Sequence, residues 1–247
     1  MEDKRITEII KRTREMRLPA MAETLLMMAE NNDIQTKDTI DVLDELTEAE
    51  FISRKNNTIA KLKKKAKLSQ ANASINDIDY HPNQKINKSV IAQLASNDYI
   101  RSKRNVIVMG ACGTGKSFII NALGNHACDS QYSVRYVRMY ELMSELVEER
   151  MMEGSCMRSI KKYSQPDLLI IDDFLLGPIN EKEAIDLFAL IDFRYSKSST
   201  IIGSQLEISE WHKRIGGALT ADSVLDRLTS NAYRLVLYGD SMRKKSE

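Results

Sequence analysis

The sequence predicts an α/β fold in which a parallel five-stranded sheet lies between helices and is preceded by a small all-helical N-terminal domain. Two observations support this prediction. From residue 105 onward, short apolar runs alternate with amphipathic helical patterns, as expected of a parallel sheet covered on both faces. Before residue 80 the chain contains no glycine and repeats its apolar residues at helical spacing.

The expected elements follow from these runs. The apolar runs that we predict to be strands are 106–109, 134–139, 168–171, 200–204 and 234–238. The helical stretches between them are 116–128, 140–152, 156–163, 181–195 and 221–231. We divide the chain into a helical domain at 1–80 and a sheet-containing domain at 81–247.

The N-terminal domain contains two helical stretches. The first begins near Ile6 and is interrupted at Pro19, because proline disfavours helix at the residue before it. The second runs from about Lys37 to Ala66 and keeps its apolar residues on one stripe. A short helix is also expected at 89–95.

Charge is polarised along the second helical stretch, which is acidic from Asp38 to Glu50 and basic at its end. One interpretation is a solvated face that suits the helix dipole. The other is a patch that binds DNA phosphates. The DNA-binding candidates are Lys61, Lys63, Lys64, Lys65 and Lys67, and in the second domain Arg158, Lys161 and Lys162.

Composition limits the class of protein. The 247 residues suffice for one large domain or two modest ones, and 36 basic side chains nearly balance 35 acidic ones, so whole-chain charge indicates no partner. Three cysteines without metal-ligand spacing favour a reducing compartment and no zinc site. With no signal-peptide pattern and no apolar run of membrane-spanning length, we expect a cytoplasmic protein with no membrane partner.

The stretch NVIVMGACGTGKS, from Asn105 to Ser117, carries the strongest signal of chemistry. Gly110, Gly115, Lys116 and Ser117 complete the phosphate-binding loop pattern at the start of a helical stretch. Glycines let the backbone curl so that several N–H groups meet one phosphate, and the helix adds the positive end of its dipole. The expected nucleotide-binding residues are Gly110, Ala111, Cys112, Gly113, Thr114, Gly115, Lys116, Ser117 and Phe118.

Within this loop, the Lys116 ammonium is expected to reach the β- and γ-phosphates, and the Ser117 hydroxyl to bind Mg²⁺. A buried strand pattern that ends in Asp172-Asp173 provides carboxylates at the same end of the sheet. We assign Asp172 to the metal and Asp173 to the attacking water. The alternative is a strand that ends in a solvated acidic turn.

Three further candidates have no local signature. Gln205 follows an expected strand, where it would hydrogen-bond the attacking water or the γ-phosphate. Arg227 would complete a neighbouring subunit's site as an arginine finger, or pair with Asp222 or Asp226 on its own helix. Arg243 would sense the phosphates of its own subunit, or belong to a solvated basic tail.

Aromatic residues near the first strand raise one more alternative. Tyr80-His81 or Tyr99-Ile100 would contact the nucleotide base, or would pack against the first strand of the sheet.

The blocks GACGTGKS, LLIIDDF, STIIGSQLEISEWH, ADSVLDRL and GDSMRKK, in this order, resemble the IstB-type transposition helper ATPases of the AAA+ group, which are related to DnaC-type helicase loaders. The resemblance covers nearly the whole chain. It implies a P-loop NTPase core of AAA+ type that hydrolyses ATP with Mg²⁺. It also implies an ATP-dependent homo-oligomer on duplex DNA that activates a partner transposase.

Carried over by position, the resemblance makes Gln205 the sensor-one residue, Arg227 the arginine finger and Arg243 the sensor-two residue. Many AAA+ proteins have glutamate where this chain has Asp173, and the shorter side chain implies slower hydrolysis. We therefore expect a DNA-binding ATPase of transposition, in which hydrolysis resets the assembly. A helicase loader is the alternative, and a small-molecule phosphotransferase is a third hypothesis.

Overall fold

The computed structural model describes residues 4–80 and 86–239. They belong to two compact units, Met1–Lys61 and Leu62–Glu247. The sequence places the end of the helical domain later, at residue 80. Residues 62–80 belong instead to the second unit, because Ala66 and Ile78 are buried in its core.

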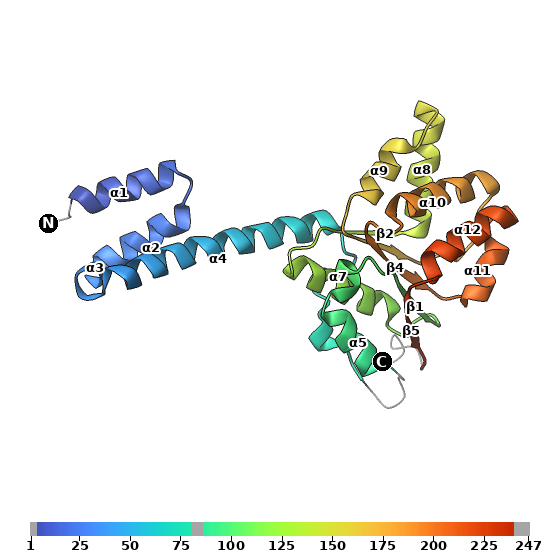
Figure 1. Cartoon of the computed structure of the whole chain (residues 1–247), viewed down its shortest axis with the longest axis horizontal. Coiled ribbons are helices and arrows are strands. Elements are labelled where there is room, and N and C mark those ends of the chain that lie inside the picture. Colours follow the sequence, from blue (N-terminus) through green and yellow to red (C-terminus); the bar gives the residue numbers. More distant parts are fainter. Residues whose placement is uncertain (1–3, 81–85, 240–247) are drawn as a thin grey trace, which may run out of the picture. The chain divides into compact units, whose positions relative to one another are not determined.

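The first unit is entirely helical, as predicted (Figure 1). Its elements are α1 (Lys4–Glu15), α2 (Pro19–Glu30), α3 (Asp33–Thr36) and the greater part of α4 (Thr39–Ala66). The interruption predicted at Pro19 is confirmed: this residue opens α2, where a missing N–H costs no hydrogen bond. A small core, which includes Ile10, Leu25 and Leu46, holds these helices together.

A buried carboxylate also stabilises this unit. Glu50 of α4 accepts hydrogen bonds from the N–H groups of Ala20 and Met21, in the first turn of α2, at 3.0 and 3.2 Å. Its other oxygen pairs with Arg54 at 2.8 Å. The Arg54 hydrogen bond, and then the N–H groups, lower the pKa of Glu50. One residue of the acidic stretch therefore caps a helix.

The second unit contains a five-stranded sheet in the order β2-β3-β4-β1-β5, with every pair parallel. The strands are β1 (Val106–Gly110), β2 (Val134–Arg138), β3 (Leu168–Asp172), β4 (Ser199–Ser204) and β5 (Tyr233–Leu237). All five predicted strands are confirmed, and no strand begins or ends more than one residue from its predicted position.

Helices cover both faces of this sheet and enclose two separate cores (Figure 1). One face carries η1 (Ile75–Asp77), α5 (Lys88–Ala95), α6 (Asp98–Arg101) and α7 (Lys116–Asp129). The other carries α8 (Met139–Glu153), α9 (Met157–Ser164), α10 (Glu181–Arg194), α11 (Ile208–Arg214) and α12 (Ala218–Thr229). The sequence analysis misses α11, because seven residues are too few to establish a helical period.

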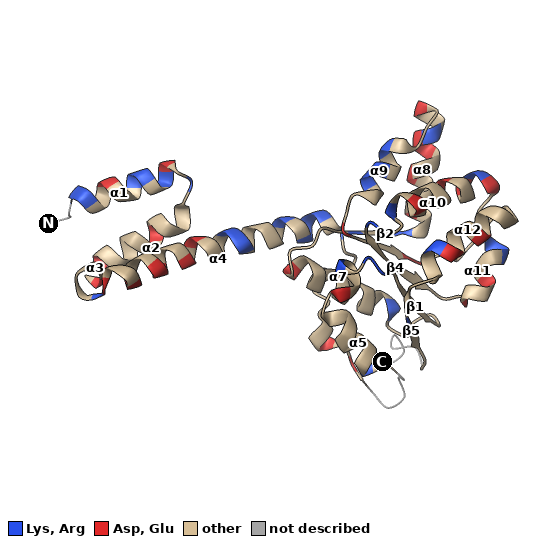
Figure 2. Cartoon of the chain, in the orientation of Figure 1, with Lys and Arg blue, Asp and Glu red and all other residues tan. Residues whose placement is uncertain are grey.

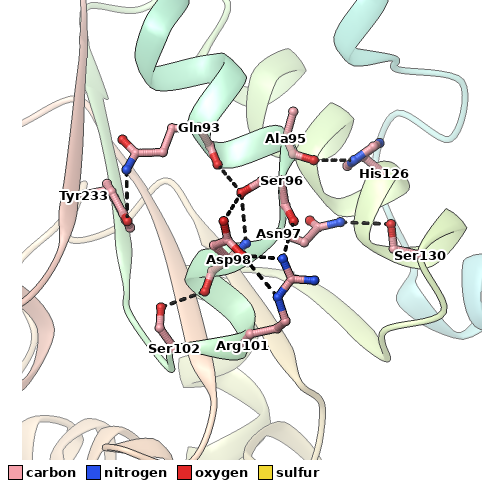
Figure 3. Close-up of polar contacts among 10 residues, drawn as sticks. All are labelled: Gln93, Ala95, Ser96, Asn97, Asp98, Arg101, Ser102, His126, Ser130 and Tyr233. Atoms are coloured by element: carbon pink, nitrogen blue, oxygen red, sulfur yellow. Dashed lines mark hydrogen bonds and ion pairs between the residues drawn. The ribbon is translucent and has the colours of Figure 1, made fainter.

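A polar corner between α5 and α6 leads the chain into β1 (Figure 3). Asn97 adopts the left-handed conformation and donates a hydrogen bond to the Ser130 hydroxyl at 2.9 Å. The His126 ring contacts the carbonyl of Ala95 at 2.7 Å. These contacts fix the corner against the end of α7. Within the described part of the chain, no helix has both the length and the apolar character needed to span a membrane.

Candidate functional site

A cavity of about 320 Å³ opens at the carboxyl end of the sheet, where β1 passes into α7. It is lined by loop residues 112–118, by Asp173 after β3 and by Gln205 after β4. The structure therefore brings together three segments that the sequence analysis identifies separately. This is the position at which open α/β sheets bind their ligands.

The phosphate loop has the backbone conformation that its glycines allow. Gly113 and Gly115 have φ angles of 84° and 91°, in the left-handed region that favours glycine. The loop also closes on itself: the Lys116 ammonium and the Thr114 hydroxyl donate to the carbonyl of Ala111 at 2.7 and 2.9 Å. A phosphate oxygen, which carries charge, is a stronger acceptor for that ammonium than a carbonyl.

Both carboxylate oxygens of Asp172 are held by hydrogen bonds. One carboxylate oxygen accepts from the Asp173 N–H at 2.9 Å, and the other accepts from the Tyr136 hydroxyl at 3.0 Å. Gly203 approaches so closely that an added Cβ would lie 2.6 Å from Oδ1 of Asp172. Asp172 is thus buried behind the cavity, whereas its neighbour Asp173 lines it.

These residues fit a magnesium-nucleotide complex. The Ser117 hydroxyl and the Asp172 carboxylate are the hard oxygen donors that Mg²⁺ prefers, and this ion normally takes its other ligands from phosphates and water. The N-terminus of α7 provides N–H groups and a positive dipole end for the phosphates themselves.

The sequence analysis misses one wall of the cavity. Gln70, Asp77, Ile78, Asp79 and Ile86 line it, all from the segment before β1. No local pattern links these residues to the phosphate loop, because only the fold brings them together.

The aromatic alternatives have different outcomes. Tyr99 and Ile100 are buried in the core beneath the sheet, so their packing interpretation is confirmed. Tyr80 also packs against this core, and His81 lies outside the described residues.

Arg227 lies at the opposite end of the sheet from this cavity. It donates to Asp192 of α10 at 2.9 Å and to the Ser223 carbonyl at 3.1 Å. It lines a second cavity of about 190 Å³ with Asn105, which precedes β1. Its ionic partner is therefore neither Asp222 nor Asp226, and it is remote from the phosphate loop of its own chain. The candidate Arg243 lies outside the described residues.

The two groups of DNA-binding candidates differ in their acidic neighbours. We call Lys61, Lys63, Lys64, Lys65 and Lys67 the first basic segment, and Arg158, Lys161 and Lys162 the second (Figure 2). In the first, Lys63 pairs with Asp129 at 2.7 Å, while the other four make no ion pair with any described residue. In the second, Arg158 and Lys162 pair with Glu153 and Glu145 of α8.

One residue outside both segments connects them. Arg135 of β2 donates to the carbonyl of Lys65 at 3.3 Å, and its guanidinium lies 5.7 Å from the ring centroid of Tyr163 on α9. The Lys162 ammonium lies 4.8 Å from the same ring. Residues of both segments therefore lie near Arg135 of β2.

Comparison with known proteins agrees with this geometry. Residues 11–247 match the model of a family described as IstB-like ATP binding protein. The chain belongs to this family. An insertion-sequence ATP-binding protein of Sinorhizobium fredii is 34% identical over 93% of each chain.

Solved structures with the same fold are more distant in sequence. Domain III of the replication initiation protein DnaA from Thermotoga maritima has a TM-score of 0.56 at 20% identity, over 72% of each chain. The DnaC helicase loader has a TM-score of 0.51 at 18% identity, over 67% of this chain and 97% of that one. The predicted fold and family are confirmed, and the protein is an ATPase with the AAA+ fold.

Proposed function

We propose that the protein is the ATP-dependent DNA-binding ATPase of an insertion sequence, acting in the cytoplasm with a partner transposase. The observation that carries this proposal is the match, over nearly the full length of both chains, to a relative named as an insertion-sequence ATP-binding protein. The phosphate loop, Asp172 and Asp173 supply the machinery that such a protein needs.

ATP occupies the cavity at the carboxyl end of the sheet. Lys116 holds the β- and γ-phosphates, and Ser117 and Asp172 hold Mg²⁺, which neutralises charge on the phosphates when bound. Asp173 and Gln205 line the cavity and orient the attacking water.

Oligomerisation completes the site. Arg227 is remote from the phosphate loop of its own chain, so it acts on the γ-phosphate held by a neighbouring subunit. ATP then bridges two subunits in a homo-oligomer, and hydrolysis removes the bridge and resets the assembly.

Duplex DNA binds the two basic segments. The first basic segment dominates, because four of its five lysines have no acidic partner among the described residues. The second contributes less, because α8 already neutralises Arg158 and Lys162. Such phosphate contacts make affinity fall steeply with salt.

Two charge variants test the DNA interface. Changing Lys64, Lys65 and Lys67 to Gln is expected to lower the slope of log affinity against log salt by about 3. The matched change of Arg158, Lys161 and Lys162 to Gln is expected to lower it by about 1. Equal slopes for both variants would assign the two segments equal roles. If the DNA affinity of the unmodified protein does not change with salt concentration, DNA binding is removed from the proposal.

Assembly tests the whole proposal. Particle imaging with duplex DNA and a non-hydrolysable ATP analogue should show oligomers that neither ligand produces alone. The oligomer, added with ATP to the transposase of the same insertion sequence, should stimulate strand transfer. If the protein stays monomeric under all of these conditions, and duplex DNA does not change its rate of ATP hydrolysis, the result would support a small-molecule phosphotransferase instead.

A further inference from the structure

A chain of polar contacts lies behind the two candidate magnesium ligands and joins the backbone of Ser117 to the carboxylate of Asp172. It starts at Asn121, a fully buried residue one turn after Ser117 on α7. The Asn121 amide nitrogen donates to the carbonyl of Ser117 at 2.6 Å and to the hydroxyl of Ser69 at 3.1 Å. The amide oxygen accepts from the N–H of Gln70 at 3.2 Å. These three hydrogen bonds tie the amide to the loop helix α7 and to the turn after α4.

The chain continues through Tyr136 to Asp172. The Ser69 hydroxyl lies close enough to the Tyr136 phenol to affect its electrostatics, and the phenol donates to Oδ2 of Asp172 at 3.0 Å. Asn121, Ser69, Tyr136 and Asp172 therefore follow one another from α7 to the end of β3.

The turn after α4 is fixed tightly against α7. An added Cβ on Gly124 would lie 2.8 Å from the side chains of both Leu68 and Ile170, so the glycine lets this turn and β3 approach α7 closely. The Asn125 amide donates to the carbonyls of Gln70 and Ala73 at 3.2 and 2.9 Å. A displacement of this turn would therefore move Ser69 and its contact with Asn121.

The same turn continues directly from the first basic segment. Lys67 has a φ of 53°, which ends α4, and Ser69 follows two residues later. Lys64, Lys65 and Lys67 are exposed, while Ala66 between them is buried in the core. Gln70 lines the nucleotide cavity. A few residues thus separate the exposed lysines from the back of the magnesium site.

We propose that Asn121, Ser69 and Tyr136 are positioning residues, which hold the two candidate magnesium ligands, Ser117 and Asp172, in fixed positions relative to each other. We call these three residues the relay. Through the turn after α4, the relay links the two ligands to the first basic segment, so that the binding of DNA and the binding of magnesium-nucleotide change each other's affinity. The link to DNA rests on the proposed function; the positioning of the ligands does not.

Single hydroxyl deletions test the positioning. Tyr136→Phe and Ser69→Ala each remove one oxygen from the relay. Tyr233→Phe and Ser96→Ala make the same chemical changes at the α5–α6 corner and its neighbour β5, outside the nucleotide cavity (Figure 3). The probe is a fluorescent non-hydrolysable ATP analogue, whose dissociation constant is measured against Mg²⁺ concentration and in EDTA.

The relay variants should need about tenfold more Mg²⁺ for tight nucleotide binding, because groups that orient metal ligands typically contribute 10- to 100-fold to metal affinity. Their affinity in EDTA should match that of the unmodified protein, as should both properties of the two control variants. A Tyr136→Phe protein with unchanged magnesium dependence would overturn the proposal. Equal losses in the control variants would do the same, because they would reveal a general loss of stability.

The same titration with saturating duplex DNA tests the link. DNA should tighten nucleotide binding at least about fivefold in the unmodified protein, and both relay variants should lose most of this gain. If DNA tightens nucleotide binding equally in all proteins, the link is wrong. If DNA does not bind the unmodified protein, the proposed function fails, and the magnesium titration still decides the positioning.

Discussion

At the carboxyl end of the sheet, Lys116, Asp173 and Gln205 line a cavity of about 320 Å³; at the amino end, Arg104, Arg194 and Arg227 line one of about 190 Å³. The first cavity combines a cation, carboxyl and amide groups around a loop of exposed backbone. The second is dominated by arginines, each of which already has partners in its own chain.

Those partners show what distinguishes Arg227. Arg194 is buried and donates to backbone carbonyls and to Thr200, and burial lowers its pKa to about 9. Arg104 stacks on the ring of Tyr233 and donates to its hydroxyl. Both are structural. Arg227 is only partly buried, and an exposed carboxylate holds it, so it can exchange that partner for a phosphate. We therefore propose that the amino end becomes functional only against another subunit.

Lys116→Ala should remove the function of the carboxyl end alone. Loss of the ammonium is expected to weaken ATP binding more than about 100-fold, because no other cation of the described chain lines that cavity. Equilibrium binding of a fluorescent ATP analogue measures the effect. The melting temperature should stay close to that of the unmodified protein, and ATP binding that survives the change would disprove the assigned role.

Arg227→Ala should remove the function of the amino end. Turnover of the assembled protein is expected to fall about 10³-fold, the scale of an arginine finger. ATP affinity of the isolated chain should not change, because Arg227 is remote from the cavity that binds it. Steady-state turnover and equilibrium binding together separate these effects, and a large loss of affinity in the monomer would contradict the division between the two ends.

Asp173→Asn should separate chemistry from binding within the carboxyl end. Asparagine tolerates the left-handed conformation that Asp173 adopts, at a φ of 53°, so the backbone should not change. Turnover is expected to fall about 10²-fold while ATP affinity and DNA-dependent assembly persist. Unchanged turnover in a single-turnover assay would remove Asp173 from its role.

Arg104→Gln is the matched control at the amino end, and it should have the smallest effect. Loss of the contact with Tyr233 is expected to lower the free energy of unfolding by about 1 kcal/mol. Turnover should stay within about twofold of the unmodified protein. Thermal unfolding and steady-state kinetics provide both values, and a loss as large as that of Arg227→Ala would mean that the amino-end arginines are not distinct.

Much of this architecture is predictable from local sequence. The five strands are found because four- to six-residue apolar runs such as Val106–Gly110 stand between helical patterns. The phosphate loop is found because its glycines and Lys116 occur at fixed spacing within one short segment. The end of the first domain is misplaced, because the helical pattern of α4 continues without change through Lys61, where the compact units divide.

The parts that escape prediction depend on contacts between distant segments. Nothing near Tyr136 indicates that its hydroxyl meets Asp172, which lies 36 residues away. Asn121 resembles any polar residue of an amphipathic helix, although it joins α7 to the turn at Ser69. The Arg227–Asp192 pair likewise forms between two helices. Such polar contacts have no sequence period, so only the fold reveals them.

The central claim is that the carboxyl end of one subunit and the amino end of another make one ATP site. Its most direct test mixes two inactive proteins, Lys116→Ala and Arg227→Ala, on duplex DNA, with co-assembly verified by light scattering. A mixed oligomer contains interfaces where an intact phosphate loop meets an intact Arg227. We predict that turnover returns in the mixture. Co-assembled subunits with no turnover beyond the sum of the two separate proteins would contradict the claim.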